Sequence, residues 1–185
     1  MNLIDKKDLR NLQIRKLTEF GKTQQKQLED EILKEKLLKS RLLHQVENVG
    51  ISISMALEVD TAPIIATLWK IKKKVYIPRG LPNRKMEFTL YTKNTFLEKT
   101  KFGVLENHDP KAEVKNDLDL IIVPGLAYGL DKNSRLGFGG GYYDRFLKKY
   151  PTQTLSLVNS VQAFDQTKWK IEDHDIPIEN LILSK

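Results

Sequence analysis

The chain has 185 residues, of which 40% are hydrophobic and 30% are charged, with a formal net charge of +7 and no cysteine. This composition is ordinary for a globular protein, and the lack of cysteine excludes disulfides, thiolate metal ligands and thiol catalysis. The longest apolar stretch, residues 118–130, is interrupted by Asp119, Pro124 and glycines and is too short to cross a bilayer, so we expect one domain over residues 1–185, no membrane association and a cytoplasmic location.

Two helices are predicted at the start of the chain. Apolar residues three and four positions apart predict a helix over residues 5–20, with Asp5 as its N-cap and Gly21 as its stop. Thr23 opens a second predicted helix that runs to about Val46. Lys6 and Arg10 lie on one face of the first helix, where they could clamp a phosphate. The pair by itself favours the alternative of two solvated charges.

Three strands and a helix are predicted in the middle of the chain. The strand signals are runs of alternating or clustered apolar residues, at 51–55, 75–78 and 86–91. Thr61 is a suitable N-cap, and Pro63 fits the first turn of a helix that extends to about residue 70. Residues 92–117 show little periodicity and are predicted to form a loop.

The C-terminal half alternates strands with helices. Leu118–Val123 is a nearly continuous apolar run, which is typical of a central strand covered on both faces. The elements predicted after it are a helix at 142–150, a strand at 154–158, a helical turn at 165–170 and a strand at 181–183. This order predicts an α/β fold, a three-layer α/β/α sandwich with a mostly parallel central sheet that is Rossmann-like but lacks the dinucleotide fingerprint.

The positive charge is concentrated in one segment. Residues 70–101 contain ten Lys or Arg and two Glu residues, an excess of eight positive charges. Such a band favours a polyanionic ligand through long-range attraction, and nucleic acid, polyphosphate or a polycarboxylate would all qualify. For Lys70–Lys74 taken alone, a solvated lysine-rich surface is an equal alternative.

A glycine loop, Gly137–Gly141, precedes the predicted helix at 142–150. Glycines let the backbone approach a ligand closely and turn its N–H groups toward an anion, and a helix N-terminus adds partial positive charge. Arg135 and Arg145 flank the loop. Its spacing fits neither the Walker A motif nor the dinucleotide-binding fingerprint, so it predicts a phosphate site of another kind.

Carboxylates lie next to this loop and near the C-terminus. Asp144 either caps the helix or holds a divalent cation against phosphate oxygens, and the residues alone favour the cap. The cluster Glu172–Asp175, which includes His174, is either a surface loop, the commoner case, or a set of ligands.

The segments around the glycine loop resemble the signature of the 5-formyltetrahydrofolate cyclo-ligase family. The similar residues are Leu120-Ile121-Ile122-Val123-Pro124-Gly125-Leu126-Ala127-Tyr128 and Arg135-Leu136-Gly137-Phe138-Gly139-Gly140-Gly141-Tyr142-Tyr143-Asp144-Arg145. Further matches occur in the family's order, at Lys6 and Arg10, Glu58-Val59-Asp60-Thr61, Phe102-Gly103 and His174-Asp175-Ile176-Pro177. Departures at Ser54–Leu57, Ser134 and Phe138 concern the shape of the substrate pocket rather than the reaction.

The resemblance implies an ATP- and Mg²⁺-dependent enzyme that closes 5-formyltetrahydrofolate to 5,10-methenyltetrahydrofolate and releases ADP and phosphate. It further implies that the formyl oxygen is phosphorylated and that N10 then attacks the formyl carbon. Such an enzyme must position two ligands and stabilise phosphoryl charge, and it needs no covalent nucleophile.

The resemblance also assigns roles to residues. It makes Arg135 and Tyr143 catalytic. It gives the ATP site to Lys6, Arg10, Arg135, Leu136, Gly137, Phe138, Gly139, Gly140, Gly141, Tyr142 and Tyr143. It gives the folate site to Met55, Glu58, Phe102 and Tyr143, and the Mg²⁺ site to Asp144 and Asp175. The lysine excess over residues 70–101 could attract the glutamate tail of a polyglutamylated folate.

We expect a monomer or weak dimer that binds no nucleic acid. The alternative is a non-catalytic nucleic-acid-binding module on the same fold, which the basic segment favours and the lack of an aromatic stacking series opposes. A third possibility, a sugar-phosphate isomerase on a related sheet, predicts turnover without ATP.

Overall fold

A six-stranded sheet forms the centre of the protein, whose computed structural model describes residues 3–100 and 103–185. The strand order is β11-β9-β6-β1-β2-β3. The strands are β1 Asn48–Ile51, β2 Lys74–Leu81, β3 Lys85–Tyr91, β6 Leu120–Ile122, β9 Gln153–Val158 and β11 Asn180–Leu183. Only the β2–β3 pair among these neighbours is antiparallel, so the mostly parallel sheet predicted from the sequence is confirmed.

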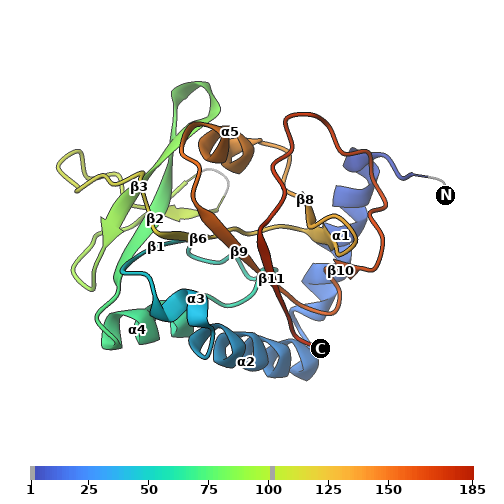
Figure 1. The fold of residues 1–185 in the computed structure, drawn as a ribbon, viewed down its shortest axis with the longest axis horizontal. Coiled ribbons are helices and arrows are strands. Elements are labelled where there is room, and N and C mark those ends of the chain that lie inside the picture. Colours follow the sequence, from blue (N-terminus) through green and yellow to red (C-terminus); the bar gives the residue numbers. More distant parts are fainter. Residues whose placement is uncertain (1–2, 101–102) are drawn as a thin grey trace.

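Helices cover both faces of this sheet (Figure 1). On one face lie α2 Gln24–Leu38, α3 Arg41–His44 and α4 Ala62–Lys70, and on the other lies α5 Tyr142–Lys149. Leu33 and Leu37, one helical turn apart on α2, are fully buried against the sheet. Phe146 of α5 packs edge-on against Phe88, with ring centroids 5.1 Å apart. Burial of each such side chain contributes roughly 1.5–3 kcal/mol, which fixes the helices on the sheet.

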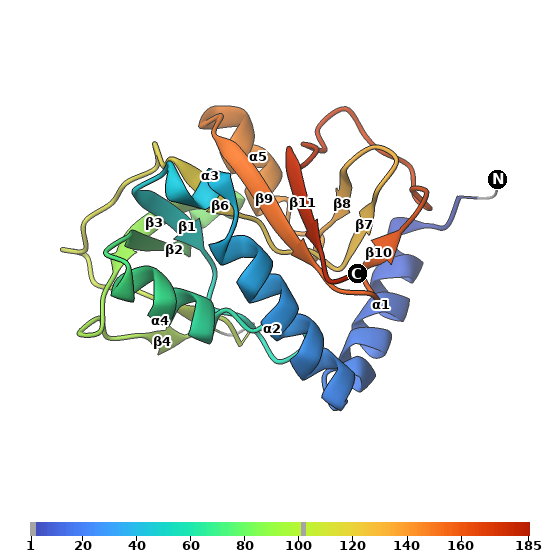
Figure 2. The ribbon, with the colours of Figure 1, turned by 60° about the horizontal axis from the view of Figure 1, so that its bottom comes forward.

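A second, smaller sheet lies beside the first and supports α1 Lys6–Phe20 (Figure 2). It consists of β7 Ala127–Gly129, β8 Ser134–Leu136 and β10 Ala163–Phe164, in the order β10-β7-β8. Leu9 of α1 is buried with Leu136 and Trp169. The sequence did not predict this sheet, because strands of two or three residues are too short to show a period.

Several predicted boundaries hold and others move. Asp5 accepts hydrogen bonds from the N–H groups of Lys7 and Asp8, and Gly21 ends α1, as predicted. The helix predicted from Thr23 to Val46 is broken, because the chain leaves the helix after Leu38 and Ser40 caps the separate α3.

Other predictions in the middle and at the end of the chain are wrong. The strand placed at residues 51–55 is β1, which ends at Ile51. Residues 92–117 contain a short hairpin of β4 Glu98–Lys99 and β5 Leu105–Glu106 rather than loop alone. Residues 165–170 form no helical turn, and Trp169 is instead buried under α1. The turn between β2 and β3 is a short 3-10 helix, Pro82–Arg84.

The carboxyl ends of the parallel strands β1 and β6 meet at one edge of the sheet. In open α/β sheets, ligands bind in the crevice beyond this edge. The segment after β1 and the connection from β6 to β7 both begin here, and the functional side chains gather beyond it. No helix in the described ranges is long and apolar enough to span a membrane.

Candidate functional site

The glycine loop connects β8 to α5 and adopts a backbone that favours glycine. Gly139 has φ +98° and Gly141, the N-cap of α5, has φ +64°. Residues with a Cβ avoid this left-handed region. The loop therefore delivers the chain to the helix N-terminus in a conformation that the glycines make accessible. The first N–H groups of α5 have no carbonyl partner within the helix, which makes this end suitable for an anion.

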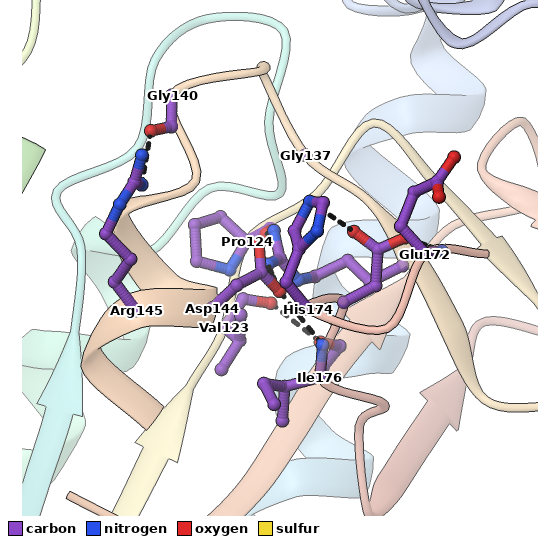
Figure 3. A network of polar contacts seen from close by, with 12 residues as sticks. Val123, Pro124, Gly137, Gly140, Asp144, Arg145, Glu172, His174 and Ile176 are labelled. Carbon is purple, nitrogen blue, oxygen red and sulfur yellow. Dashed lines mark hydrogen bonds and ion pairs between the residues drawn. The ribbon is translucent and has the colours of Figure 1, made fainter. Parts of the chain in front are cut away.

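Two arginines hold carbonyl groups of the glycine loop. Arg10 donates from Nε to the carbonyl oxygen of Gly137 at 2.9 Å, and Arg145 donates from Nη1 to that of Gly140 at 2.8 Å (Figure 3). In a trans peptide the N–H points opposite to the C=O. The two arginines thus orient the N–H groups of Phe138 and Gly141 away from themselves. The sequence placed Arg145 beside the loop but gave it no role.

Arg135 and Asp144 form an ion pair beneath this loop. Nη2 of Arg135 lies 3.0 Å from Oδ1 of Asp144, and the N–H of Ile176 donates to the same oxygen at 3.1 Å (Figure 3). The guanidinium also lies 5.8 Å from the ring centroid of Tyr143. Gly141 is the N-cap of α5, and no side chain caps that helix. The helix-cap interpretation of Asp144 is therefore wrong.

A second ion pair joins α1 to the C-terminal segment. Nζ of Lys6 lies 2.6 Å from Oδ2 of Asp175, which also accepts the N–H of Glu172 at 2.9 Å. His174 approaches the other oxygen, Oδ1, with its Nε2 at 3.8 Å (Figure 3). Burial opposes the ionisation of Asp175, but the Glu172 N–H and the Lys6 ammonium outweigh it and hold the pKa below its usual range. Asp175 is thus a carboxylate in a partly buried, positively charged setting.

The donor set of Asp144 and Asp175 fits a cation that arrives with phosphate. Within residues 3–100 and 103–185, no three acidic or histidine side chains form a metal-binding group. Mg²⁺ commonly binds through only one or two carboxylates and takes its other ligands from substrate phosphates and water. Asp144 bonds to Ile176, the neighbour of Asp175, so the two carboxylates belong to one region of the site.

A buried carboxylate lies on the sheet side of the site. Glu58 is only 8% exposed, and its Oε2 accepts the N–H of Met55 at 2.7 Å. Burial raises the pKa of Glu58 above its ordinary value. Burial also raises the pKa of the Tyr143 phenol, and the negative charge of Glu58 adds to that shift. Tyr143 stands two residues after the glycine loop, and its phenol lies within range of the charge of Glu58.

Glu58 also lines a small cavity of about 30 Å³ at the carboxyl ends of β1 and β6. Ser52 and Tyr128 line the same cavity. The Tyr128 hydroxyl donates to the carbonyl oxygen of Val123 at 3.1 Å, and burial raises its pKa to about 12. Tyr128 belongs to the signature stretch, but sequence reasoning assigned it no role. Its position two residues before the β7–β8 turn gave no signal of burial.

Most of the site residues predicted from the sequence lie around the glycine loop, but some do not meet there. Met55 contacts Glu58 through its backbone N–H. Phe102 lies outside the described residues. Lys70–Lys74 lie at the opposite edge of the sheet, because Lys74 pairs with Asn48 at the start of β1. Lys73 donates to the carbonyl oxygens of His44 and Val46. That run therefore lies at the amino ends of β1 and β2, away from the carboxyl edge, and its attraction for a substrate tail stays a prediction.

The chain is similar to a known enzyme family over nearly its whole length. A model described as the 5-formyltetrahydrofolate cyclo-ligase family matches residues 3–184. A 5-formyltetrahydrofolate cyclo-ligase of Haemophilus influenzae is 30% identical over 147 residues, 75% of this chain and 76% of the relative. The enzyme of that name from Escherichia coli K12 is 32% identical over 144 residues, 72% of this chain and 76% of the relative.

The fold agrees with the same group of proteins. The solution structure of Aquifex aeolicus 5,10-methenyltetrahydrofolate synthetase superimposes with a TM-score of 0.82 at 26% identity. The alignment covers 97% of this chain and 90% of the Aquifex chain. The resemblance seen in the sequence motifs therefore extends to the three-dimensional arrangement.

Proposed function

We propose, from the family to which the chain belongs, the 5-formyltetrahydrofolate cyclo-ligases, that it uses ATP and Mg²⁺ to close 5-formyltetrahydrofolate to 5,10-methenyltetrahydrofolate. The observation that carries the proposal is that two unlike regions adjoin: Arg135 donates toward the Pro124 carbonyl, and Pro124 lines the same cavity as Glu58. One is the glycine loop with its arginines and the N-terminus of α5, and the other is the buried carboxylate Glu58. The first suits a phosphate and the second suits the hydrogen-bond donors of a pterin ring.

The reaction needs ATP because a formamide oxygen is a poor leaving group. Transfer of the γ-phosphoryl group to the formyl oxygen breaks the bond to ADP and gives an iminium phosphate. The N10 lone pair then attacks the formyl carbon, the carbon–oxygen bond breaks, and phosphate leaves as N10 loses its proton. Both steps depend on holding the two substrates in line and on stabilising phosphoryl charge.

The loop and its basic residues are proposed to bind the triphosphate. Arg10 and Arg145 hold the carbonyls of Gly137 and Gly140, so the N–H groups of the same two peptides point away from these arginines. Arg135 is proposed to stabilise charge on the transferred group. Its Nε is buried without a hydrogen-bond partner among the described residues, which supports a ligand in that direction. Lys6 is proposed to add positive charge from α1.

Asp144 and Asp175 would hold Mg²⁺ at the phosphates. A bound Mg²⁺ would neutralise part of the phosphate charge. Arg135 and Lys6 pair with the two carboxylates, so both cations also lie beside the proposed phosphate site.

The folate ring is proposed to lie between Glu58 and Tyr143. An ionised Glu58 can accept hydrogen bonds from the pterin N–H groups, and its single described acceptor contact, with Met55, leaves Oε1 for this role. The Tyr143 ring would form a wall against the flat ligand, and Met55 would border it.

Incubation with 5-formyltetrahydrofolate and Mg-ATP tests the proposal. The methenyl product should appear by its ultraviolet absorbance, and omission of ATP or chelation of Mg²⁺ should abolish it. Product formation without ATP would contradict the proposed reaction. A lack of product together with salt-sensitive nucleic-acid binding would favour the binding module instead.

A further inference from the structure

Two adjacent carboxylates on α2, Glu29 and Asp30, both turn inward and fasten α2 to different parts of the protein. Glu29 is 2% exposed and the Asp30 side chain is 12% exposed. Acidic residues are rarely buried unless they are paired or hydrogen-bonded. The partners of each carboxylate therefore indicate what it holds in place.

Glu29 fastens α2 to the C-terminal strands. It accepts the N–H and the hydroxyl of Ser160 at 2.7 and 2.6 Å, and the hydroxyl of Ser184 at 2.7 Å. Burial opposes its ionisation, but these bonds and one from Gln25 outweigh it and lower the pKa of Glu29. These partners follow β9 and β11, and neither belongs to residues 54–61, the segment that carries Glu58.

Asp30 fastens α2 to the segment that presents Glu58. Its Oδ2 accepts the backbone N–H of Asp60 at 3.2 Å and the ammonium of Lys26, a pair in which the Lys26 side chain is only 8% exposed. Burial raises the pKa of Asp30, while Lys26 opposes that shift. Asp60 stands two residues after Glu58. In Figure 2, this segment runs from β1 to the side of α2 and turns back to enter α4.

The segment itself is closed by its own hydrogen bonds. Ser54 and Thr61 exchange two of them, from the Ser54 N–H to Oγ1 at 2.9 Å and from the Thr61 N–H to Oγ at 3.1 Å. The Glu58 N–H donates to the Met55 carbonyl at 2.9 Å, and Oε2 of Glu58 accepts the Met55 N–H. These bonds tie residues 54–61 into one closed segment, so a displacement at Asp60 would be passed to Glu58.

We propose that Asp30 is a positioning residue for Glu58, and that its ion pair with Lys26 holds its carboxylate against the Asp60 N–H. The inference rests on the proposed role of Glu58 in binding the folate. A misplacement of about 1 Å in a positioning group is enough to reduce turnover about 10²-fold. Loss of the Asp30 contact should thus weaken the binding of 5-formyltetrahydrofolate. It should leave the binding of ATP nearly unchanged, because the proposed ATP site lies on the other side of Tyr143.

The test compares Asp30→Ala with Glu29→Gln, which changes the neighbouring carboxylate on the same helix. Asp30→Ala should raise KM for 5-formyltetrahydrofolate about tenfold with little change in KM for ATP. Glu29→Gln should lower the unfolding temperature without a selective change in either KM. The proposal would be overturned if Asp30→Ala changed KM for the folate and KM for ATP equally. It would also be overturned if Glu29→Gln raised KM for the folate as selectively as Asp30→Ala.

A rescue variant separates position from general damage. Asp30→Asn combined with Lys26→Met keeps an oxygen that can accept the Asp60 N–H and removes the ammonium that would otherwise be buried unpaired. This double variant should return KM for the folate to within about threefold of the original protein. A folate KM in the double variant as high as that of Asp30→Ala would contradict the positioning role. If Asp30→Ala does not fold, the more conservative double variant is compared with the original protein instead.

A readout without turnover distinguishes this proposal from failure of the proposed function. Hydrogen exchange at the Asp60 amide should be faster in Asp30→Ala than in Glu29→Gln. If the original protein forms no methenyl product, the proposed function fails, whereas the exchange comparison still decides whether Asp30 holds the segment. Unchanged exchange at Asp60 would overturn the inference even in an active enzyme.

Discussion

Arg135 makes contacts that only a guanidinium can satisfy together. It pairs with Asp144, donates from Nη1 toward the Pro124 carbonyl at 3.4 Å and lies against the Tyr143 ring. Its side chain is 5% exposed, so its charge acts in surroundings that screen it weakly. A planar fork with several donors can serve these partners at once, whereas the single ammonium of lysine cannot.

Arg135→Ala should therefore lower kcat by roughly 10²–10³, the usual effect of removing one well-placed donor to developing charge. Arg135→Lys keeps the charge and loses the fork, so it should recover only part of this loss. Steady-state kinetics with both substrates saturating would check both variants. Equal and near-original kcat values for the two would exclude a role for Arg135 in the chemical step.

The burial of Glu58 sets stability against substrate binding, because the folded protein favours its neutral form and the proposed folate contact uses its charged form. Its pKa is raised in the folded state by burial, so the folded protein binds a proton there more tightly than the unfolded chain. Stability is then greatest below the ordinary pKa of Glu and falls as the pH rises toward and through the raised value. Glu58→Gln keeps the acceptor for Met55 and removes the charge. It should be more stable than the original protein at pH 7, with a difference that shrinks at about pH 4, measured by denaturant unfolding.

The KM of Glu58→Gln for the folate should rise, because the charged acceptor is lost. A stability difference that stays constant across pH would refute the raised pKa of Glu58.

The elements with long, strong patterns were predicted, and the strands of two or three residues in the smaller sheet were not. Leu118–Val123 was recognised because a strand covered on both faces is continuously apolar. The break at Ser40 was missed because the apolar stripe of α2 continues through Leu42 and Val46. The start of β1 was missed as well: Gly50 lies within this strand, where a Cβ would come within 2.7 Å of the Leu118 side chain. Close packing between distant segments does not appear in a local pattern.

The residue types of the site were visible in the sequence, whereas their contacts were not. The glycine loop, flanked by Arg135 and Arg145, predicted a phosphate site, and this stays a prediction. The sequence could not show that Arg10 binds a loop carbonyl or that Asp144 pairs with Arg135, because these partners come together only in the folded chain. Asp30 looked like one more charge on an amphipathic helix.

The entry to α5 allows a test of backbone conformation against side-chain contact. Gly141 has φ +64°, and a Cβ there would lie 2.5 Å from Nη1 of Arg145. Gly141→Ala should lose about 1–2 kcal/mol of stability from left-handed strain, whereas Gly141→Asn should lose less because Asn tolerates this conformation. Both variants displace Arg145 and should raise KM for ATP similarly. Thermal unfolding and kinetics together separate the effects, and equal stability of the two variants would contradict the strain argument.

At the scale of the whole molecule, positive charge is placed at both edges of the sheet, and only one edge faces the site. Lys72 and Lys74 are exposed near the amino ends of β1 and β2. Arg84 and Lys85 are exposed at the β2–β3 turn, beyond the carboxyl end of β2 and on the α5 side (Figure 1). Attraction between exposed charges falls off over a Debye length of about 8 Å at physiological salt, so a charge at the far edge contributes little to the encounter with substrate.

Two double variants with the same loss of charge test this asymmetry. Arg84→Gln with Lys85→Gln should lower kcat/KM for the anionic substrates several-fold at low salt and flatten its dependence on salt, because steering acts on the rate of encounter. Lys72→Gln with Lys74→Gln should leave kcat/KM within about twofold at every salt concentration, since these lysines face away. Kinetics from about 10 mM to about 300 mM salt would measure both effects, a range over which the Debye length shortens severalfold. Equal losses for the two pairs would mean that net charge, rather than its placement at the carboxyl edge, attracts the substrates.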